Sequence, residues 1–508
     1  MNTLIVSVLV SQNLFAKTYG WTGDDYIYSV VQTTDGGFAL AGTTQAFGAG
    51  GDDVLVIRLD PNGNLVWAKA YGDTSVDVGY SIVQATDGGF VVTGGTTRYA
   101  GPRRNILVLK LEPDGDLSWA KTYGAGATYE EGRSIIRTTD GGYAIGAWGN
   151  NLIALRLDAD GNTNWARYYY GPGWLGEAYS IVQTSDGGYA ITGVIYEDAI
   201  YSDNAIPILR LNPDGSVLWT RFFFGMVGGL HTWADQGNFI IQTSDGGFTV
   251  AGITEVGNFV GDLPMFMVMK TDSDGDLSWA TVATGIHDYA TSIVQTSDGG
   301  LVAAGHTRTM NNDFLIMKMD NVTGGVLWSR TFNATVDDHA QSIILTPDGG
   351  FAVAGNTFNI PVGEHDIAFL KMDGNGDYSD CVVDQVPPLG TPDFLTPDLS
   401  ISAPAWTHTT TNLDFITTAS APTVTDVCQP LYEHVEEINP GSHGWITCSP
   451  VTGGVLFVSN EALPIKLYSA DGRVAISDNL EKGQTRIPLD SGVYLWQAGP
   501  YKGKAVVR

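Results

Sequence analysis

Short apolar runs separated by turn residues fill the first three quarters or so of this chain. From residue 80 onward, apolar-rich runs cover 81–84, 90–94, 105–111 and 117–121. Asp87-Gly88-Gly89 separates the first two runs, and Pro113-Asp114-Gly115 separates the last two. Asp-Gly supplies the positive φ angles of tight hairpins, and Pro and Gly favour turns. The pattern predicts four antiparallel strands in about 52 residues, which is one β-propeller blade.

The tripeptide Asp-Gly-Gly marks this unit seven times, beginning at Asp35, Asp87, Asp140, Asp186, Asp245, Asp298 and Asp348. Self-similarity at a period near 50 residues indicates a repeat architecture. The last unit lacks a fourth strand, but residues 14–20 match the pattern of residues 117–124. The sequence therefore predicts an all-β, seven-bladed β-propeller closed by an N-terminal strand and followed by a small C-terminal β-sandwich. Closure of this kind removes exposed sheet edges.

Changes in composition and in the apolar pattern along the chain predict four segments. Residues 1–13 form a possible signal remnant or leading segment, and residues 14–381 form the propeller. Residues 382–440 are rich in Pro and Thr and are expected to leave the propeller and contact it again. Residues 441–508 return to short apolar runs and predict the C-terminal sandwich.

The charge of the chain disfavours two classes of binding partner. The formal net charge is −29, which opposes binding to nucleic acid and to anionic membranes, because both interactions depend on Lys and Arg. The longest N-terminal apolar run, residues 4–10, is too short to span a membrane. We therefore expect no nucleic-acid partner and no transmembrane span.

Seven carboxylates precede the inner strands at nearly equivalent positions. We expect them to surround one mouth of the central channel, where they either cap backbone amides of neighbouring blades or hold a cation or water cluster. Capping is the favoured interpretation. The residues are Asp25, Asp77, Glu130, Glu177, Asp235, Asp288 and Asp338.

Metal and catalytic motifs are weak in this sequence. The turns beginning at Asp158 and Asp272 resemble the start of a calcium loop, but position twelve is Tyr169 in one and Ala283 in the other, where calcium loops need an acidic ligand. We interpret both as hairpin turns, so no cofactor is evident and calcium has little support. The eight histidines form no catalytic pattern, and no nucleophile elbow, P-loop or dinucleotide fingerprint occurs. A non-enzymatic role is favoured.

The variable loops carry the candidate ligand site. Loops on a rigid scaffold commonly carry binding residues, and aromatic residues concentrate around residues 168–174 and 222–233. We expect Trp174, His231 and Trp233 to contact a glycan or a surface protein, because exposed aromatics stack on sugars and anchor partners. The alternative is that these rings pack between blades.

The three cysteines lie outside the repeats. Cys381 and Cys428 bracket the segment that follows them, and in an oxidising compartment a disulfide between them is worth about 2–4 kcal/mol. Free thiols are the alternative. No metal-binding Cys-x-x-Cys spacing occurs.

The C-terminal segment resembles the sorting domain of proteins exported by the type IX secretion system of Bacteroidetes-like bacteria. The matching stretches are residues 466–468 with 471–474, residues 491–495, and the terminal residues 504–508. The Asp-Gly-Gly repeats are similar to propeller repeats often found before such tails. The resemblance implies export across both membranes, with the secretion machinery as a partner of the tail, followed by tail removal or surface attachment.

Together these observations predict an extracellular or outer-surface protein. Its expected function is binding, adhesion or matrix formation. An extracellular polysaccharide lyase or hydrolase, and a structural subunit of a surface assembly, are the alternatives.

Overall fold

The computed structural model describes residues 14–378, apart from short gaps, and from residue 389 onward the strands alone. The gaps before residue 378 are at 50, 99–103, 125–128, 170–173, 198–203, 228–229, 232–234, 256–263, 284–286, 309–311, 333–336 and 359–364. The chain divides into two compact units, residues 1–427 and 428–508, and each is described by itself. No helix in the described residues is long and apolar enough to cross a membrane.

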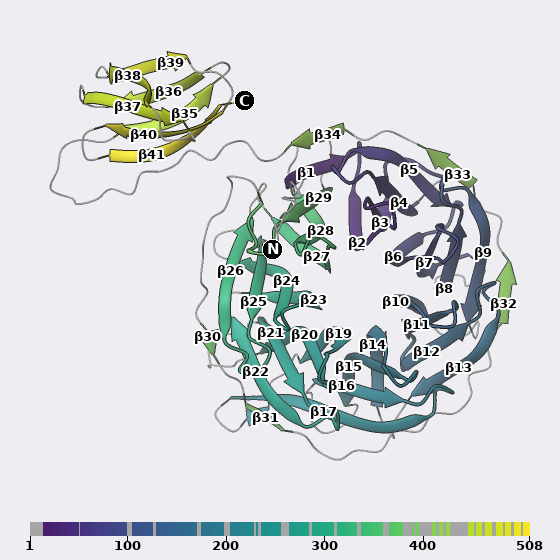
Figure 1. Cartoon of the computed structure of the whole chain (residues 1–508). Helices are drawn as coiled ribbons and strands as arrows, with labels where there is room; N and C mark the ends of the chain where they lie inside the picture. Colours follow the sequence, from purple (N-terminus) through teal and green to yellow (C-terminus); the bar gives the residue numbers. More distant parts are fainter. Residues whose placement is uncertain are drawn as a thin grey trace, which may run out of the picture. The chain divides into compact units, whose positions relative to one another are not determined.

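The first unit is propeller-like, with groups of four antiparallel strands arranged around a central opening (Figure 1). Two neighbouring groups are joined into one larger sheet, where Trp148 pairs with Glu177. Within each sheet the strands follow chain order from the innermost strand outward, except that the last sheet is completed from the N-terminus. The inner strands are β2 (Asp25–Gln32), β6 (Asp77–Gln84), β10 (Glu131–Arg137), β14 (Trp174–Gln183), β19 (Gln236–Gln242), β23 (Tyr289–Gln295) and β27 (Asp338–Leu345).

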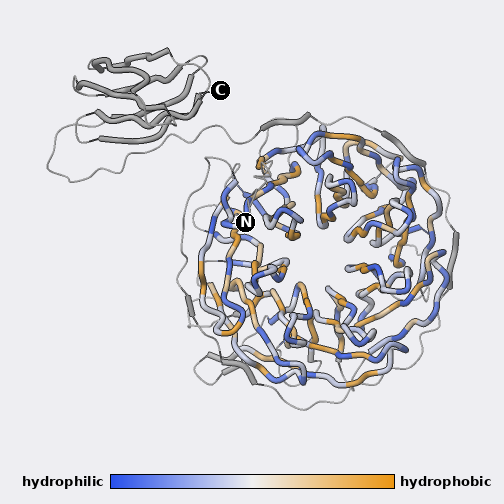
Figure 2. Tube along the Cα trace, viewed as in Figure 1, coloured by the Kyte–Doolittle hydropathy of each residue, from blue (hydrophilic) through white to orange (hydrophobic). Residues whose placement is uncertain are grey.

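The second and third strands of each sheet are almost entirely buried. The second strands are β3 (Phe38–Thr44), β7 (Phe90–Thr96), β11 (Tyr143–Trp148), β15 (Tyr189–Glu197), β20 (Phe248–Glu255), β24 (Leu301–Arg308) and β28 (Phe351–Phe358). The third strands are β4 (Asp53–Leu59), β8 (Asn105–Leu111), β12 (Leu152–Leu157), β16 (Asn204–Leu211), β21 (Pro264–Thr271), β25 (Asn312–Met319) and β29 (His365–Met372). Figure 2 shows hydrophobic and hydrophilic positions around the ring, and third strands such as β4 and β8 are mainly apolar, as expected for strands buried on both faces.

The outer strands include one from the other end of the sequence. They are β5 (Leu65–Gly72), β9 (Leu117–Gly124), β13 (Thr163–Tyr169), β17 (Val217–Val227), β22 (Leu277–Ala283), β26 (Val326–Phe332) and β1 (Phe15–Gly20). Strand β1 pairs antiparallel with β29, from Phe15 opposite Lys371 to Tyr19 opposite Ile367. The predicted pairing of the N-terminal strand with the last unit is therefore confirmed. A two-residue strand, β18 (Leu230–His231), folds back on β17.

The Asp-Gly-Gly turns fix the first hairpin of each sheet. Gly36 has φ 87°, which glycine adopts without strain. The carboxylate of Asp35 accepts hydrogen bonds from Thr33 Oγ1 at 2.5 Å and from the Gly37 amide at 3.2 Å. It also forms an ion pair with Arg58 of the third strand at 2.5 Å. The same ion pair recurs as Asp87–Lys110, Asp140–Arg156, Asp186–Arg210, Asp245–Lys270, Asp298–Lys318 and Asp348–Lys371. The repeated motif therefore has a structural role.

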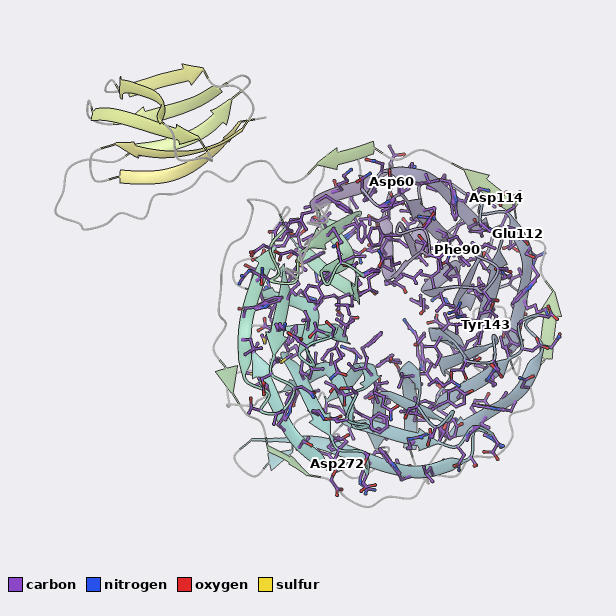
Figure 3. All side chains as sticks on the ribbon, viewed as in Figure 1. Asp60, Phe90, Glu112, Asp114, Tyr143 and Asp272 are labelled. Atoms are coloured by element: carbon purple, nitrogen blue, oxygen red, sulfur yellow. The ribbon has the colours of Figure 1, made fainter. Side chains whose placement is uncertain are left out.

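The hydrophobic core lies between neighbouring sheets. One cluster joins Val54, Val56 and Tyr71 of one sheet to Phe90 and Leu107 of the next. At the outer strands, an aromatic ring covers the next sheet's turn glycine. A Cβ added at Gly115 would lie 3.0 Å from the Trp67 ring, and Tyr71 Oη donates to the Gly115 carbonyl at 2.6 Å. In Figure 3 the turn residues Asp60, Glu112 and Asp272 lie toward the outside of the ring, whereas Phe90 and Tyr143 lie among the strands.

Five short strands between residues 389 and 426 each pair with the edge of an outer strand (Figure 1). Along the chain, they pair with the outer strands in the reverse of chain order. They are β30 (Leu389–Gly390) on β22, β31 (Asp393–Leu395) on β17, β32 (Thr409–Asn412) on β9, β33 (Ile416–Ala419) on β5 and β34 (Thr423–Asp426) on β1. The expectation that this part of the chain contacts the propeller again is confirmed.

The second unit contains two antiparallel sheets. One has the order β35-β36-β39 and the other β38-β37-β40-β41. Their strands are β35 (Ile446–Val451), β36 (Gly454–Ser459), β37 (Leu463–Ser469), β38 (Val474–Leu480), β39 (Gly483–Pro488), β40 (Gly492–Ala498) and β41 (Tyr501–Val507).

Candidate functional site in the central channel

A recurring irregularity in the inner strands brings one residue of each strand to the central channel. The pairing of β2 with β3 skips one residue between Ile27 and Ser29, so Tyr28 is bulged out of the ladder. A β-bulge of this kind redirects a side chain away from its regular face. The equivalent bulged residues are Tyr80, Arg133, Tyr179, Asn238, Thr291 and Gln341. All seven line one cavity of about 360 Å³.

A circle of serine hydroxyls fixes the inner strands to one another. Ser29 Oγ accepts the Ile82 amide at 3.3 Å, and Ser81 Oγ accepts the Ile135 amide at 3.2 Å. Ser134, Ser180, Ser292 and Ser342 make the same contact, so six of the seven inner strands are joined to the next one in this way. Strand β19 carries Phe239 instead of serine at this position. The bulged residues are therefore presented from a hydrogen-bonded frame.

Arg133 is the cation of the cavity lining. Its Nη2 atom lies 2.8 Å from the carboxylate of Glu131, which is fully buried. Its guanidinium carbon lies 4.1 Å from the centre of the Tyr80 ring and 5.4 Å from that of Trp148. Glu131 also forms an ion pair with Arg104. These contacts hold the guanidinium in one orientation, and stacking on aromatic faces adds cation–π attraction.

Three tyrosines supply the aromatic part of the lining. The rings of Tyr28 and Tyr80 lie 5.2 Å apart and are tilted by 54°. Tyr179 donates its hydroxyl hydrogen to Glu177. Burial raises the pKa of Tyr28, of Tyr80 and of Tyr179 above the usual value. All three are neutral hydroxyls near pH 7, suited to hydrogen bonding rather than to acting as bases.

The predicted channel-mouth carboxylates are not among the residues that line this cavity. Six of them are fully buried: Asp25, Asp77, Glu130, Asp235, Asp288 and Asp338. Glu177 is partly buried and accepts the Tyr196 hydroxyl at 3.1 Å.

Several of these carboxylates accept backbone amides, as in the capping interpretation. Asp25 accepts the Trp21 amide at 2.9 Å, Asp77 the Asp73 amide at 3.1 Å, Asp235 the Gly225 amide at 2.7 Å and Asp288 the Arg308 amide at 3.0 Å. Glu130 instead accepts the Tyr168 hydroxyl at 2.6 Å.

Burial perturbs the titration of these groups. It raises the pKa of Asp25 and of Asp77 to about 6. Asp366, at the start of β29, has its pKa raised to about 7 by burial and by the nearby charge of Asp25. Within the described residues, one oxygen of Asp25 and one of Asp366 are buried without a hydrogen-bond partner.

The two calcium-like turns are hairpin turns, as predicted. Asp272 Oδ1 accepts the amides of Asp274 and Asp276, at 3.0 and 2.9 Å. Asp158 Oδ1 accepts the Asn162 amide at 2.7 Å. In the described part of the chain, no three His, Cys, Asp or Glu side chains are grouped to hold a metal ion.

The predicted loop site falls largely outside the described residues. Trp174 begins β14 and His231 ends β18, but only their backbone is described, and Trp233 is not described. Cys381 and Cys428 also lie outside the described residues. The aromatic loop site and the disulfide stay predictions.

Comparisons with known proteins give distant similarities in structure alone. No protein-family model and no curated protein matches the sequence. Sqt1 from Chaetomium thermophilum is 11% identical, with 70% of this chain and 97% of that chain covered and a TM-score of 0.42. An ulvan lyase, a polysaccharide lyase, is 10% identical, with 70% and 96% covered and a TM-score of 0.45. PorZ, a surface component of the type IX secretion system of Porphyromonas gingivalis, is 9% identical, with 96% and 100% covered and a TM-score of 0.21. At these values none of them assigns a function.

The channel residues were missed by reasoning from the sequence because the bulged position holds mixed residue types, with tyrosine in three strands and Arg, Asn, Thr or Gln in the others. A positional signal exists: in six of the seven inner strands the bulged residue directly precedes the serine of the hydrogen-bonded circle, as in Tyr28-Ser29 and Arg133-Ser134. An alignment of the repeats on that serine places the bulged residues of these six strands in one column.

Proposed function

We propose that this chain is a secreted or surface-attached binding protein. Its four-stranded sheets are taken as the seven blades of a β-propeller, and the two C-terminal sheets as a β-sandwich that serves as a type IX sorting or anchoring domain. The ligand is held by the bulged residues of the central channel. The aromatic loops bearing Trp174, His231 and Trp233 are taken as a second contact region for a glycan or surface protein.

One observation carries the binding role. The cavity lining combines an oriented guanidinium, three neutral tyrosine hydroxyls and side-chain amides. A concave site with a few well-placed polar groups among aromatic rings is typical of ligand recognition. Burial raises the pKa of Tyr28, Tyr80 and Tyr179, so these hydroxyls are neutral hydrogen-bonding groups near pH 7.

Binding is tested with the purified full chain and immobilised polysaccharides. We expect retention on at least one acidic polysaccharide, with no change in the length of the polysaccharide chains after prolonged incubation. Shortened chains would instead establish a lyase or hydrolase. Failure to retain any polysaccharide or surface protein would contradict the binding role.

Localisation is tested by expressing the chain, with and without residues 428–508, in a host that has type IX secretion. We expect the full chain to be cleaved by protease added to whole cells and the shortened chain to be protected in the periplasm. Equal exposure of both would contradict a sorting role for the C-terminal unit.

A further inference from the structure

The central cavity has an electrostatic character opposite to that of the whole protein. The chain carries a formal net charge of −29. The cavity lining nevertheless includes Arg133 and, among the described residues, neither Asp nor Glu. Because Arg133 is the charged residue among the described lining residues, the charge that a ligand meets in the cavity is positive, which favours an anionic ligand.

The guanidinium of Arg133 is oriented but retains capacity for a ligand. Its ion pair with Glu131 involves Nη2, whereas a guanidinium has five N–H donors. About a quarter of the Arg133 side chain is exposed. Glu131 also pairs with Arg104. Arg104, Arg133 and Glu131 together therefore carry one excess positive charge. A planar guanidinium is well suited to a ligand carboxylate, which it binds through two parallel hydrogen bonds.

The rest of the lining suits hydroxyl groups and a ring. Gln236 Nε2 donates to Asn238 Oδ1 at 2.5 Å, and Asn238 Nδ2 donates to the Ala290 carbonyl at 2.8 Å, so these amides are held in place. Gln341, on the last inner strand β27, adds a further amide to the lining. The faces of Tyr28 and Tyr80 offer stacking surface, since aromatic rings are apolar on their faces. A cavity of about 360 Å³ is at the small end of ligand sites.

We propose that the central cavity binds a small sugar acid, with its carboxylate paired to Arg133 and its hydroxyls hydrogen-bonded to the amides and tyrosine hydroxyls of the bulged positions. The proposal rests on the binding function proposed above. It names the ligand class of that site.

The ligand class is tested by calorimetric titration of the full chain at constant ionic strength. The probes are glucuronate and galacturonate, the neutral sugars methyl glucoside and methyl galactoside, acetate, and inorganic phosphate. We expect saturable binding of at least one uronate and at least tenfold weaker binding of the matching neutral sugar, because a charge-assisted hydrogen-bonded pair is lost. Binding of phosphate or acetate as tight as that of the uronate would overturn the proposal.

The role of Arg133 in binding the carboxylate is tested by Arg133→Gln, with Arg330→Gln as the matched control. Arg330 has the same type of environment on an outer strand: it pairs with Asp377 at 3.3 Å and lies 5.4 Å from the Trp328 ring. We expect R133Q to weaken uronate binding about tenfold or more and R330Q to change it less than about threefold. Equal effects of the two variants would contradict a role for Arg133.

A second variant guards against loss of folding in R133Q. Arg133→Lys keeps the positive charge and loses the planar fork, so it should retain uronate binding at an intermediate affinity. A folded R133K chain with the uronate affinity of the wild type would show that the planar guanidinium does not pair with the carboxylate and would overturn the proposal. If no monosaccharide binds while polysaccharide is still retained, the sugar-acid assignment fails and the binding function stands. If neither is retained, both fail.

Discussion

Replacing Asp366 by asparagine should remove part of the pH dependence of the unfolding free energy. Asp366 is 2% exposed and lies so close to Gly20 that a Cβ there would overlap its carboxylate. Burial and the charge of Asp25 raise its pKa from 3.8 to about 7. A shift of about three units corresponds to about 4 kcal/mol when the group is fully ionised.

The sign follows from proton linkage. Because the pKa of Asp366 is higher in the folded than in the unfolded chain, the folded state binds more protons between about pH 4 and pH 7. The free energy of unfolding therefore falls as pH rises through that window and is constant above it. Between pH 5 and pH 8 the loss from Asp366 is about 2–3 kcal/mol. Asp366→Asn removes an ionisable group of similar shape and should remove that loss.

The assay is urea unfolding of wild type and D366N at pH 5 and pH 8. We expect the difference in unfolding free energy, variant minus wild type, to be about 2–3 kcal/mol more favourable at pH 8 than at pH 5. Asp274→Asn is the control, because Asp274 is exposed and the substitution changes net charge equally. If D366N and wild type differ by the same amount at both pH values, the buried-carboxylate argument is refuted.

Three further predictions concern the ring. Tyr19→Ala, which empties a fully buried site in the closing strand, should lower the unfolding free energy by about 3–5 kcal/mol, and wild-type stability would contradict its closing role. Ser81→Ala should cost about 1 kcal/mol by removing the acceptor of the Ile135 amide, whereas Ala at the exposed Ser118 should leave the urea midpoint unchanged. Gly376→Ala should cost at least about 1 kcal/mol, since Gly376 has φ 81° and a Cβ there would lie 2.8 Å from the Trp328 ring; an unchanged melting temperature would contradict this.

Much of the ring could be predicted because each repeat carries its own turn and strand signals. The Asp-Gly-Gly spacing located every first hairpin, since only a tight turn with positive φ fits that tripeptide. The closing strand was recognised because residues 14–20 repeat the outer-strand pattern, with Phe15 in the place that tryptophan takes elsewhere. In the structure Phe15 covers Gly63 as Trp67 covers Gly115.

The channel site could not be predicted in the same way. Its residues lie where the ladder slips by one position, and strict alternation assigns a residue to a face only when the register is continuous. The register shift next to Tyr28 depends on pairing with β3 rather than on the identity of Tyr28. The carboxylate positions followed from spacing, but their depth of burial depends on the packing of adjacent sheets and did not.

Because β1 pairs with strands from the other end of the first unit, the ring can close only in a chain that contains both segments. Phe15 pairs with Lys371, and the other edge of the same strand pairs with β34, where Gly20 lies opposite Thr423. A chain that stops before residue 365 leaves β1 without either partner, and a chain that has lost residues 1–20 leaves β29 with an open edge. Such edges are templates for aggregation and entry points for proteases. We therefore expect a truncated chain of either kind to aggregate or to be cleaved more readily than a chain that contains both segments.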